Sequence, residues 1–285
     1  MYLKRLFLTF MIFFAFTTVQ AETKEFNMVF VPASEKGDEG DYTSLINIVE
    51  DLTGFEINII KVTDYNAAVE AMRAGRADIA WYGGKTYIKA AEIADAEAFA
   101  ASVRSGEKNA NYYAYFVVRK DSKIKKFSDI KGKVLSLNSI GSTSGDLIPQ
   151  VELAKINLST KNKDDFKNVF YAGSHDACLL AVLNKQSDVC GMSSRNFEAR
   201  LADNTFKMEQ IRIIHKSDAV PPPPLAYSKR IPLEDRKKIK RAVLEAHKHG
   251  TIGGYGGKMS HYISVEDSDY DVLRKVVALL KKNKQ

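Results

Sequence analysis

The chain repeats one stretch of its own sequence, and this repeat constrains the fold more than any other feature. A shift of 110 residues lays DYNAAVEAMRAGRADIAWYGG (64–84) over SHDACLLAVLNKQSDVCGMSS (174–194), so that Asp78 aligns with Asp188. Each copy has apolar residues at helical spacing, then a polar turn, then an aspartate at the start of an apolar strand. Two such units in related positions predict two similar lobes, each with its own sheet.

Strand-like and helical segments alternate along the chain. We expect a strand at 27–31, a helix at 43–52 and a strand at 56–61, followed by another helix. This alternation predicts an α/β fold with mixed, mainly parallel sheets. Four consecutive prolines at 221–224 mark an extended connector, because proline is excluded from central strands.

The lobes are expected to be joined by a two-stranded hinge. The segment 111–139 reads as a long strand, a basic loop, a short helix from Ser128 and a second strand, which would carry the chain into the next lobe. The proline run is the natural return. The expected boundaries are a signal peptide at 1–21, the first lobe at 22–114, the second lobe at 115–224, and a return to the first lobe with C-terminal helices at 225–285.

The N-terminus predicts export. Lys4 and Arg5 precede an apolar stretch, residues 6–19, and Ala21 ends a small-residue cleavage site. No cysteine follows that stretch, so we expect an exported protein without a lipid anchor. Removing Lys4 and Arg5 leaves 42 − 2 = 40 basic against 35 acidic residues, a net charge of +5. This charge is mild and no basic stripe is interleaved with aromatics, so nucleic acid is not an expected partner. We expect a monomer.

Three hydroxyl side chains open a predicted helix. Ser142, Thr143 and Ser144 are followed by Gly145 in the sequence NSIGSTSGDLIPQ. Such residues cap helices by accepting hydrogen bonds from free backbone N–H groups. The same groups form a cradle for a phosphate-like anion at the positive end of a helix. The sequence of this stretch leaves both interpretations open.

The repeat also places two candidate binding residues. Tyr65 aligns with His175, and each precedes the apolar stripe of its helix. Helix N-termini point toward the crevice at the carboxyl ends of the strands in open α/β sheets. We therefore expect Tyr65 and His175 to face a cleft from opposite lobes, with Tyr82 lining its floor.

The two cysteines, Cys178 and Cys190, leave two states open. An even, small number of cysteines in an oxidising compartment favours a disulfide. Buried free thiols are the alternative, and Cys178 lies close enough to the helical face of His175 for a thiol ligand.

Three segments resemble a known family. MRAGRADIAWYGG, STSGDLIP and AGSHDACLLAVLNKQSDV are similar to marker segments of the phosphonate-binding periplasmic proteins of ABC transporters, which include phosphite and phosphate relatives. The resemblance implies a type II periplasmic binding protein fold, a membrane permease as partner, no cofactor and no enzymatic activity. It also implies that Ser142, Thr143 and Ser144 grip phosphoryl oxygens, and that Tyr65, Tyr112 and His175 make the other ligand contacts. Tyr112 enters only through the resemblance.

Two positions depart from the family pattern. Arg195 stands where phosphonate receptors of this type have a glutamate for the ligand's amino group, and Pro223 stands where they have an aspartate. We therefore hypothesise that the receptor does not prefer 2-aminoethylphosphonate and takes a fully ionised oxyanion, with Arg195 a possible ligand contact. The alternative for Arg195 is a solvated surface arginine.

Other functions use the same residues. Ser142 or Ser144 with His175 and Asp176 has the residue types of a hydrolytic triad, but adjacent residues on a helix diverge. The five histidines show no metal-ligand spacing. A sensor for a membrane kinase, or a thiol-assisted oxyanion or metalloid binder, would keep the fold and change the role.

Overall fold

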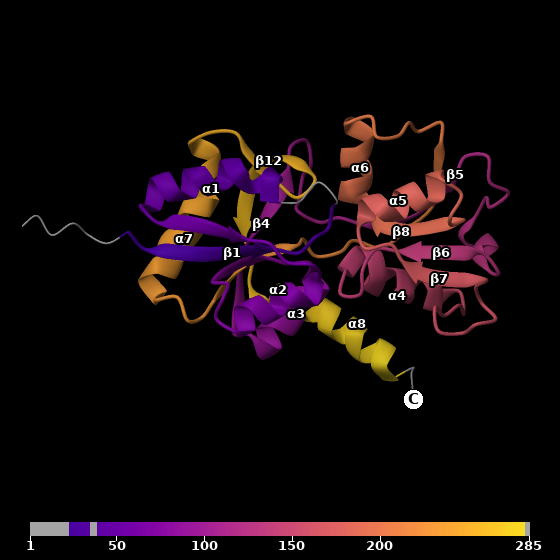
Figure 1. The fold of residues 1–285 in the computed structure, drawn as a ribbon, viewed down its shortest axis with the longest axis horizontal. Helices are drawn as coiled ribbons and strands as arrows, with labels where there is room; N and C mark the ends of the chain where they lie inside the picture. The colour runs from indigo at the N-terminus through magenta and orange to yellow at the C-terminus, as the bar shows by residue number, and fades with distance from the viewer. Residues whose placement is uncertain (1–22, 35–38, 283–285) are drawn as a thin grey trace, which may run out of the picture.

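Two lobes, each built around its own sheet, lie side by side along the long axis of the molecule (Figure 1). The computed structural model describes residues 23–34 and 39–282. The first lobe has a seven-stranded sheet of order β11-β12-β4-β10-β3-β1-β2, and the second has a five-stranded sheet of order β7-β6-β8-β5-β9. The α/β class with two lobes is thus confirmed.

The first lobe takes strands from both ends of the chain. Its strands are β1 Glu25–Phe30, β2 Glu56–Ile60, β3 Ile79–Trp81, β4 Ala96–Arg104, β10 Pro224–Ser228, β11 Ile252–Gly254 and β12 Gly257–Ser264. Its helices are α1 Glu39–Thr53, α2 Tyr65–Arg73, α3 Gly84–Ile93, α7 Leu233–Glu245 and α8 Asp271–Lys282, with short 3-10 turns at Ala246–Lys248 and Asp267–Tyr270. Helices α1 and α7 pack together on one side of the sheet and α2 and α3 on the other (Figure 1). The apolar faces of both layers meet in one large core.

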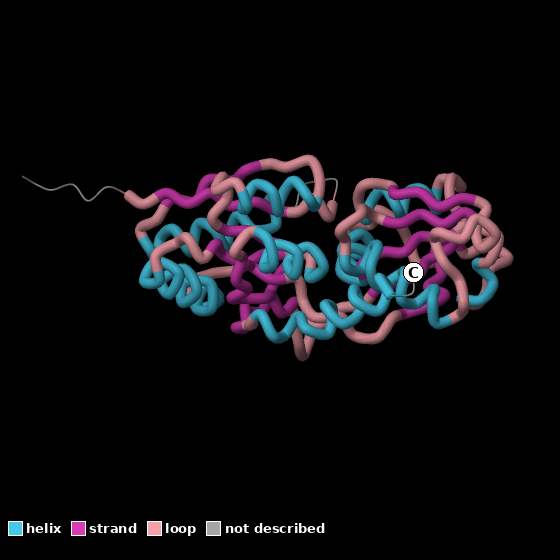
Figure 2. Tube along the Cα trace, turned by 90° about the horizontal axis from the view of Figure 1, so that it is seen from below, coloured by secondary structure: helices cyan, strands magenta, loops and turns pink. Residues whose placement is uncertain are grey.

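The second lobe is formed by the middle of the chain. Its strands are β5 Ala114–Arg119, β6 Val134–Leu137, β7 Asn168–Tyr171, β8 Val189–Ser193 and β9 Ile211–Lys216. Its helices are α4 Ile148–Lys155, α5 His175–Leu183 and α6 Ser194–Ala202, with a 3-10 turn at Phe127–Ile130 and a π-helical turn at Thr143–Leu147 that runs directly into α4. One core lies under α5 and α6, and a separate core includes Leu153 of α4. Seen from below, each lobe contains its own set of strands and helices (Figure 2).

The internal repeat is a structural repeat. Helices α2 and α5 occupy equivalent positions, and each is followed by a turn with a positive φ at Gly75 or Lys185. The Asp78 carboxylate accepts a hydrogen bond from the Asn27 N–H at 2.9 Å, and the Asp188 carboxylate accepts one from the Val134 N–H at 2.9 Å. Each repeated aspartate therefore fastens its unit to a neighbouring strand of its own sheet.

The predicted bias toward parallel strands is wrong. Four of the ten strand pairings, β1–β2, β1–β3, β6–β7 and β6–β8, are parallel, and six are antiparallel. The parallel pairs are the ones joined by crossover helices. Strands β4, β5, β9 and β10 flank the passages between lobes and pair antiparallel with their neighbours. The alternation of helices and strands does not reveal the direction of these strands.

The chain passes between the lobes at residues 105–113 and 217–223, which lie between the sheet strands. The two passages are paired at one point, because Tyr112 and Val220 exchange backbone hydrogen bonds of 3.2 and 2.8 Å. The proline run differs from expectation at its last residue. Pro224 is the first residue of β10, which lies between β3 and β4, a position that proline tolerates.

The predicted signal peptide, residues 1–21, lies outside the described residues. In the part of the chain that the structure describes, no helix is both long enough and apolar enough to cross a membrane.

A disulfide joins Cys178 on α5 to Cys190 on β8. Both residues are fully buried in the core under α5 and α6, together with Leu179 and Phe197. The bond therefore ties a helix of the second lobe to the strand beneath it.

Reduction of this disulfide should lower the free energy of unfolding by about 3 kcal/mol, because the bond closes a loop with a sequence separation of 12 residues. The measurement is urea unfolding with and without reductant. Thiol titration of the unfolded, unreduced protein should find no free thiol, and two titratable thiols would contradict the bond.

Candidate functional site

Helix N-termini converge at the boundary between the lobes. Tyr65 is the first residue of α2, His175 is the first residue of α5, and Thr143 begins the helix that continues into α4. Each helix follows a strand or loop that ends at this boundary, so the N–H groups of its first turn point there. The cap side chains of Asp64, Ser142 and Ser174 accept hydrogen bonds from some of these groups. The boundary thus gathers the positive ends of several helices.

Ser142 acts as the cap of its helix. Its Oγ accepts a hydrogen bond from the Gly145 N–H at 3.0 Å and a second from the Asn138 side-chain amide at 3.2 Å. A side chain on Gly145 would collide with Asn138 and approach the His175 ring, since an added Cβ would lie 2.3 Å from Asn138 Cβ and 2.9 Å from His175 Cε1. The glycine lets this helix start pack directly against both residues.

Thr143 and Ser144 meet the connector between the lobes. The hydroxyls of both residues form hydrogen bonds with the Tyr112 side chain, which lower its pKa, while burial raises that pKa by more. Thr143 Oγ1 also accepts a hydrogen bond from the Lys85 N–H in the first lobe at 2.9 Å. The hydroxyls after the cap are therefore shared with the other lobe and with the connector.

Tyr65 contacts the same group from the first lobe. Its hydroxyl accepts a hydrogen bond from the Asn138 amide at 3.3 Å, and its ring lies against Gly141 and Gly83. Gly141 has φ +109°, and a Cβ there would lie 2.9 Å from Tyr65 Cβ. A glycine is thus required at 141 both for its backbone conformation and for this close approach.

His175 is a neutral donor. Its Nδ1 accepts a hydrogen bond from the Ser193 N–H at 3.2 Å, and burial lowers its pKa to about 3. A neutral imidazole that accepts at Nδ1 carries its proton on Nε2. His175 therefore offers one N–H donor without a positive charge.

The lobes are in contact around these residues. The backbone N–H of His175 donates to the Ala33 carbonyl at 3.1 Å, and the Thr86 hydroxyl donates to the Gly141 carbonyl at 2.9 Å. The candidate side chains lie between the two lobes and are each at most 3 % exposed: Tyr65, Tyr112, Ser142, Thr143, Ser144 and His175. The structure thus brings together all six of the main candidates.

Tyr82 does not join this cluster. Its hydroxyl donates to the Ala68 carbonyl at 3.2 Å beneath α2, and burial raises its pKa. The structure therefore places this candidate in the core of the first lobe and does not support its predicted position on the cleft floor. Trp81, the residue before it, packs between Tyr42 and Tyr255.

Arg195 is buried, so its interpretation as a solvated surface arginine is wrong. It lies in the first turn of α6 and is 1 % exposed. Its terminal nitrogens donate to Ser102 and Ala110 in the first lobe and the connector, and its guanidinium carbon lies 5.8 Å from the Tyr112 ring centroid. Arg195 thus borders the cluster through Tyr112.

The structure does not support the hydrolytic triad or the thiol ligand. Asp176 lies 3.7 Å from Arg200, and the His175 Nδ1 that a triad aspartate would orient is occupied by the Ser193 N–H. Cys178 is bonded to Cys190 and offers no thiolate. Among the described residues, no group of three or more histidine, cysteine, aspartate or glutamate side chains could hold a metal ion.

One residue of the cluster does not follow from the sequence analysis. Asn138 is fully buried and links Tyr65 to Ser142. It directly precedes the serine-rich stretch at the end of β6, and that position is the signal which could have identified it. Lys85 forms a short ion pair with Asp146, which is almost fully buried, so its charge is held by that carboxylate.

Comparison with known proteins identifies relatives of the chain. Residues 28–270 match the family described as ABC transporter, phosphonate, periplasmic substrate-binding protein. The phosphonates-binding periplasmic protein of Escherichia coli is 30% identical over 211 residues, which are 72% of this chain and 61% of that protein. The matched part therefore spans less than two thirds of that relative. The phosphate-import protein PhnD of Mycolicibacterium smegmatis is 25% identical over 279 residues, 91% of this chain and 87% of that protein.

Solved structures share the fold. A binding protein component of an ABC phosphonate transporter from Pseudomonas aeruginosa has a TM-score of 0.80 at 23% identity, covering 92% of this chain and 88% of that one. PhnD1 from Prochlorococcus marinus, solved in complex with methylphosphonate, has a TM-score of 0.78 at 19% identity, covering 91% of this chain and 99% of that one. The type II binding-protein architecture is thereby confirmed.

The buried imidazole makes a prediction about stability and pH. Because the pKa of His175 falls from 6.5 to about 3 on folding, its contribution to stability is present above pH 6.5 and is lost as the pH falls toward 3. His175→Asn, which can still accept from the Ser193 N–H, should flatten this loss. Urea unfolding at pH 7 and pH 4.5 measures the change in the free energy of unfolding between the two pH values. The control is His249→Asn at an exposed position, which should leave the pH dependence of the parent; equal slopes for both variants would contradict the assignment.

Proposed function

Because this chain belongs to the family of periplasmic substrate-binding proteins of phosphonate ABC transporters, we propose that it captures a phosphorus oxyanion between its lobes and presents it to a membrane permease. The family consists of binding proteins, so the chain is not an enzyme. The proposal concerns the ligand, the residues that hold it, and the closure of the lobes.

One observation carries the proposal. Hydroxyl and imidazole groups of Thr143, Ser144, Tyr112 and His175 meet at the boundary of the lobes, and none of these four residues is a carboxylate. A phosphonate, phosphite or phosphate ion needs several hydrogen-bond donors once water is removed. The helix that begins at Thr143 adds N–H groups and a favourable dipole. This set of donors suits an oxyanion better than a neutral or cationic ligand.

The donors belong to different parts of the molecule. Thr143, Ser144 and His175 are in the second lobe, Tyr65 is in the first, and Tyr112 is on the connector. A ligand that contacts all of them favours the arrangement in which the walls meet, and so shifts the lobes toward closure. The closed form is then the state that the permease recognises.

The same proposal covers location and assembly. Residues 1–21 act as a signal peptide that is cleaved after export, and the chain works in the periplasm as a monomer without a lipid anchor. The oxidising compartment is compatible with the buried disulfide of the second lobe.

Arg195 narrows the ligand class. Its buried guanidinium lies over the Tyr112 ring, 5.8 Å from the ring centre, and the hydroxyl of that ring forms hydrogen bonds with Thr143 and Ser144. An ammonium substituent directed toward this side of the cleft would meet a like charge, whereas a methyl group or a carboxylate would not. The preferred ligand is therefore a phosphorus oxyanion without a cationic substituent.

Loss of one donor should weaken binding strongly. Hydrogen bonds to charged groups contribute roughly 1.5 to 3 kcal/mol, so Ser144→Ala should raise the Kd for the tightest ligand by about 10- to 150-fold. Calorimetry on ligand-stripped protein provides the measurement. The matched control is Ser139→Ala, five residues earlier on a part-exposed loop, which should bind as the parent does. If Ser144→Ala bound the ligand with the Kd of the parent, Ser144 would not be a ligand contact.

The ligand class is tested by a calorimetric panel of phosphate, phosphite, methylphosphonate, phosphonoacetate, 2-aminoethylphosphonate and sulfate. We expect 2-aminoethylphosphonate not to be the tightest ligand, and Arg195→Gln to narrow its disadvantage relative to methylphosphonate because the like charge is removed. The proposed class fails if 2-aminoethylphosphonate binds at least about tenfold tighter than the other five, a difference of 1.4 kcal/mol.

A further inference from the structure

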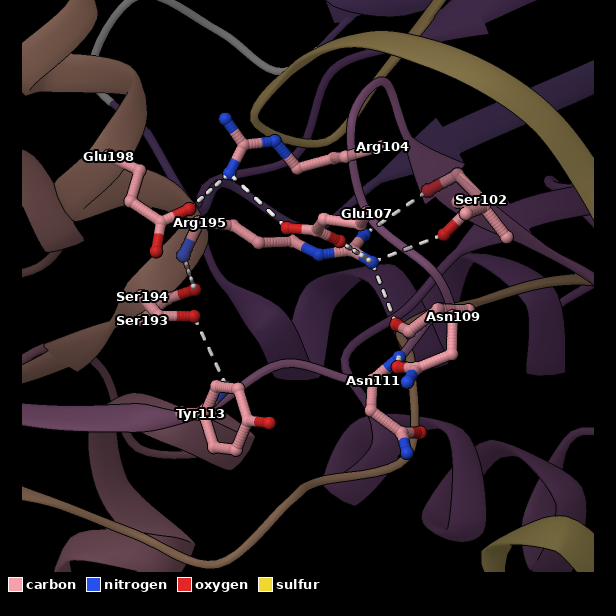
Figure 3. A network of polar contacts seen from close by, with 12 residues as sticks. Ser102, Arg104, Glu107, Asn109, Asn111, Tyr113, Ser193, Ser194, Arg195 and Glu198 are labelled. Carbon is pink, nitrogen blue, oxygen red and sulfur yellow. Dashed lines mark hydrogen bonds and ion pairs between the residues drawn. The ribbon is translucent and has the colours of Figure 1, made fainter.

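Two Arg-x-x-Glu segments face each other across the lobes. Arg104 and Glu107 lie at the end of β4 and in the turn after it, and Arg195 and Glu198 lie in the first two turns of α6. Figure 3 shows the four side chains meeting at one place between the lobes. The first lobe with the start of its connector presents one cation and one anion three residues apart, and so does the second lobe.

The charges pair crosswise. Arg104 forms a short ion pair with Glu198 of the other lobe, and Arg195 Nη2 lies 3.9 Å from Glu107 Oε2. Arg104 Nη1 also lies 3.6 Å from Glu107 Oε1 in its own lobe. Glu198 is further held by the Tyr115 hydroxyl, which donates to its Oε1 at 3.3 Å. The arrangement is self-complementary and carries no net charge among its four ionic side chains.

Arg195 is the buried part of this arrangement. Its Nη1 donates to Ser102 Oγ at 3.2 Å, and its Nη2 donates to the Ser102 carbonyl at 3.1 Å and the Ala110 carbonyl at 2.7 Å. These acceptors belong to the first lobe and the connector, so the three bonds require that α6 lies against β4. They also hold the guanidinium beside Tyr112, whose hydroxyl bonds the residues after the helix cap.

We propose that these two Arg-x-x-Glu pairs form a lock that exchanges partners when the lobes open and close. In the closed form each arginine faces the glutamate of the other lobe, and Arg195 positions Tyr112 for the ligand. When the lobes separate, Arg195 pairs with Glu198 three residues along α6, as i,i+3 pairs do on helices, and Arg104 keeps its pair with Glu107. Every charge of the lock has a partner in the open form and in the closed form. The lock therefore guides closure of the lobes and still permits them to reopen and release the ligand.

Partner exchange predicts an unusual result for a charge swap. Glu198→Arg alone replaces the partner of Arg104 with a third cation, and should open the lobes and raise the Kd for methylphosphonate by about 3- to 10-fold. Adding Arg104→Glu restores a crosswise pair in the closed form. It also places like charges three residues apart within each lobe, which penalises the open form. The double variant should therefore bind at least as tightly as the parent and be more compact without ligand.

The measurements are calorimetry with methylphosphonate and the radius of gyration from X-ray scattering of the ligand-free protein. Arg241→Glu on α7 is the matched control, because it reverses one arginine of an exposed ion pair far from the boundary and should change neither quantity. The proposed lock is contradicted if the double variant binds methylphosphonate as weakly as Glu198→Arg does, or if its radius of gyration is as large. The binding readout rests on the proposed function, but the scattering does not. If no variant binds methylphosphonate and the ligand-free double variant is still more compact, the lock stands and that ligand is excluded.

Discussion

The free N–H groups at helix N-termini are the constraint on which the rest of the structure depends. In each lobe a strand leads toward the boundary and a helix returns from it, so the helix starts at Tyr65, Thr143 and His175 gather there. These groups cannot be buried without acceptors. Ser142 satisfies one, and the Ala33 carbonyl of the opposite lobe satisfies another. A boundary made of helix starts is therefore polar and suited to the proposed oxyanion.

Contacts between the lobes serve two different purposes. Around Thr143 they are made by hydroxyl and backbone groups, which are also the donors that an oxyanion would use. Around Arg195 they are made by charged groups that pair with each other. The proposed ligand site and the proposed lock adjoin each other at Tyr112, which also pairs with Val220 on the returning connector. A change on the connector can therefore affect both regions through one residue.

Sequence patterns were informative where they reflected local structure. The repeat predicted two equivalent helix–turn–strand units, because apolar spacing, the turn and the strand-starting aspartate are all local features. Sequence patterns are not informative where packing between distant residues decides the position of a side chain or the direction of a strand. The sequence predicts Tyr82 in the cleft, yet its hydroxyl donates a hydrogen bond to the Ala68 carbonyl in the core of the first lobe. Strand direction also does not follow from local patterns, because antiparallel pairing beside the connectors depends on how the chain passes between lobes.

The amino-acid sequence by itself determined the two-lobe plan and the alignment of Tyr65 with His175, since both follow from a repeat whose units are local patterns of residue types. Only the tertiary structure decided that Cys178 is bonded to Cys190, that Asn138 links the two lobes, and that Arg195 is buried against Ser102. Those outcomes depend on which surfaces meet when the lobes are brought together. Burial and charge pairing between residues some 90 positions apart leave no periodic trace in the chain.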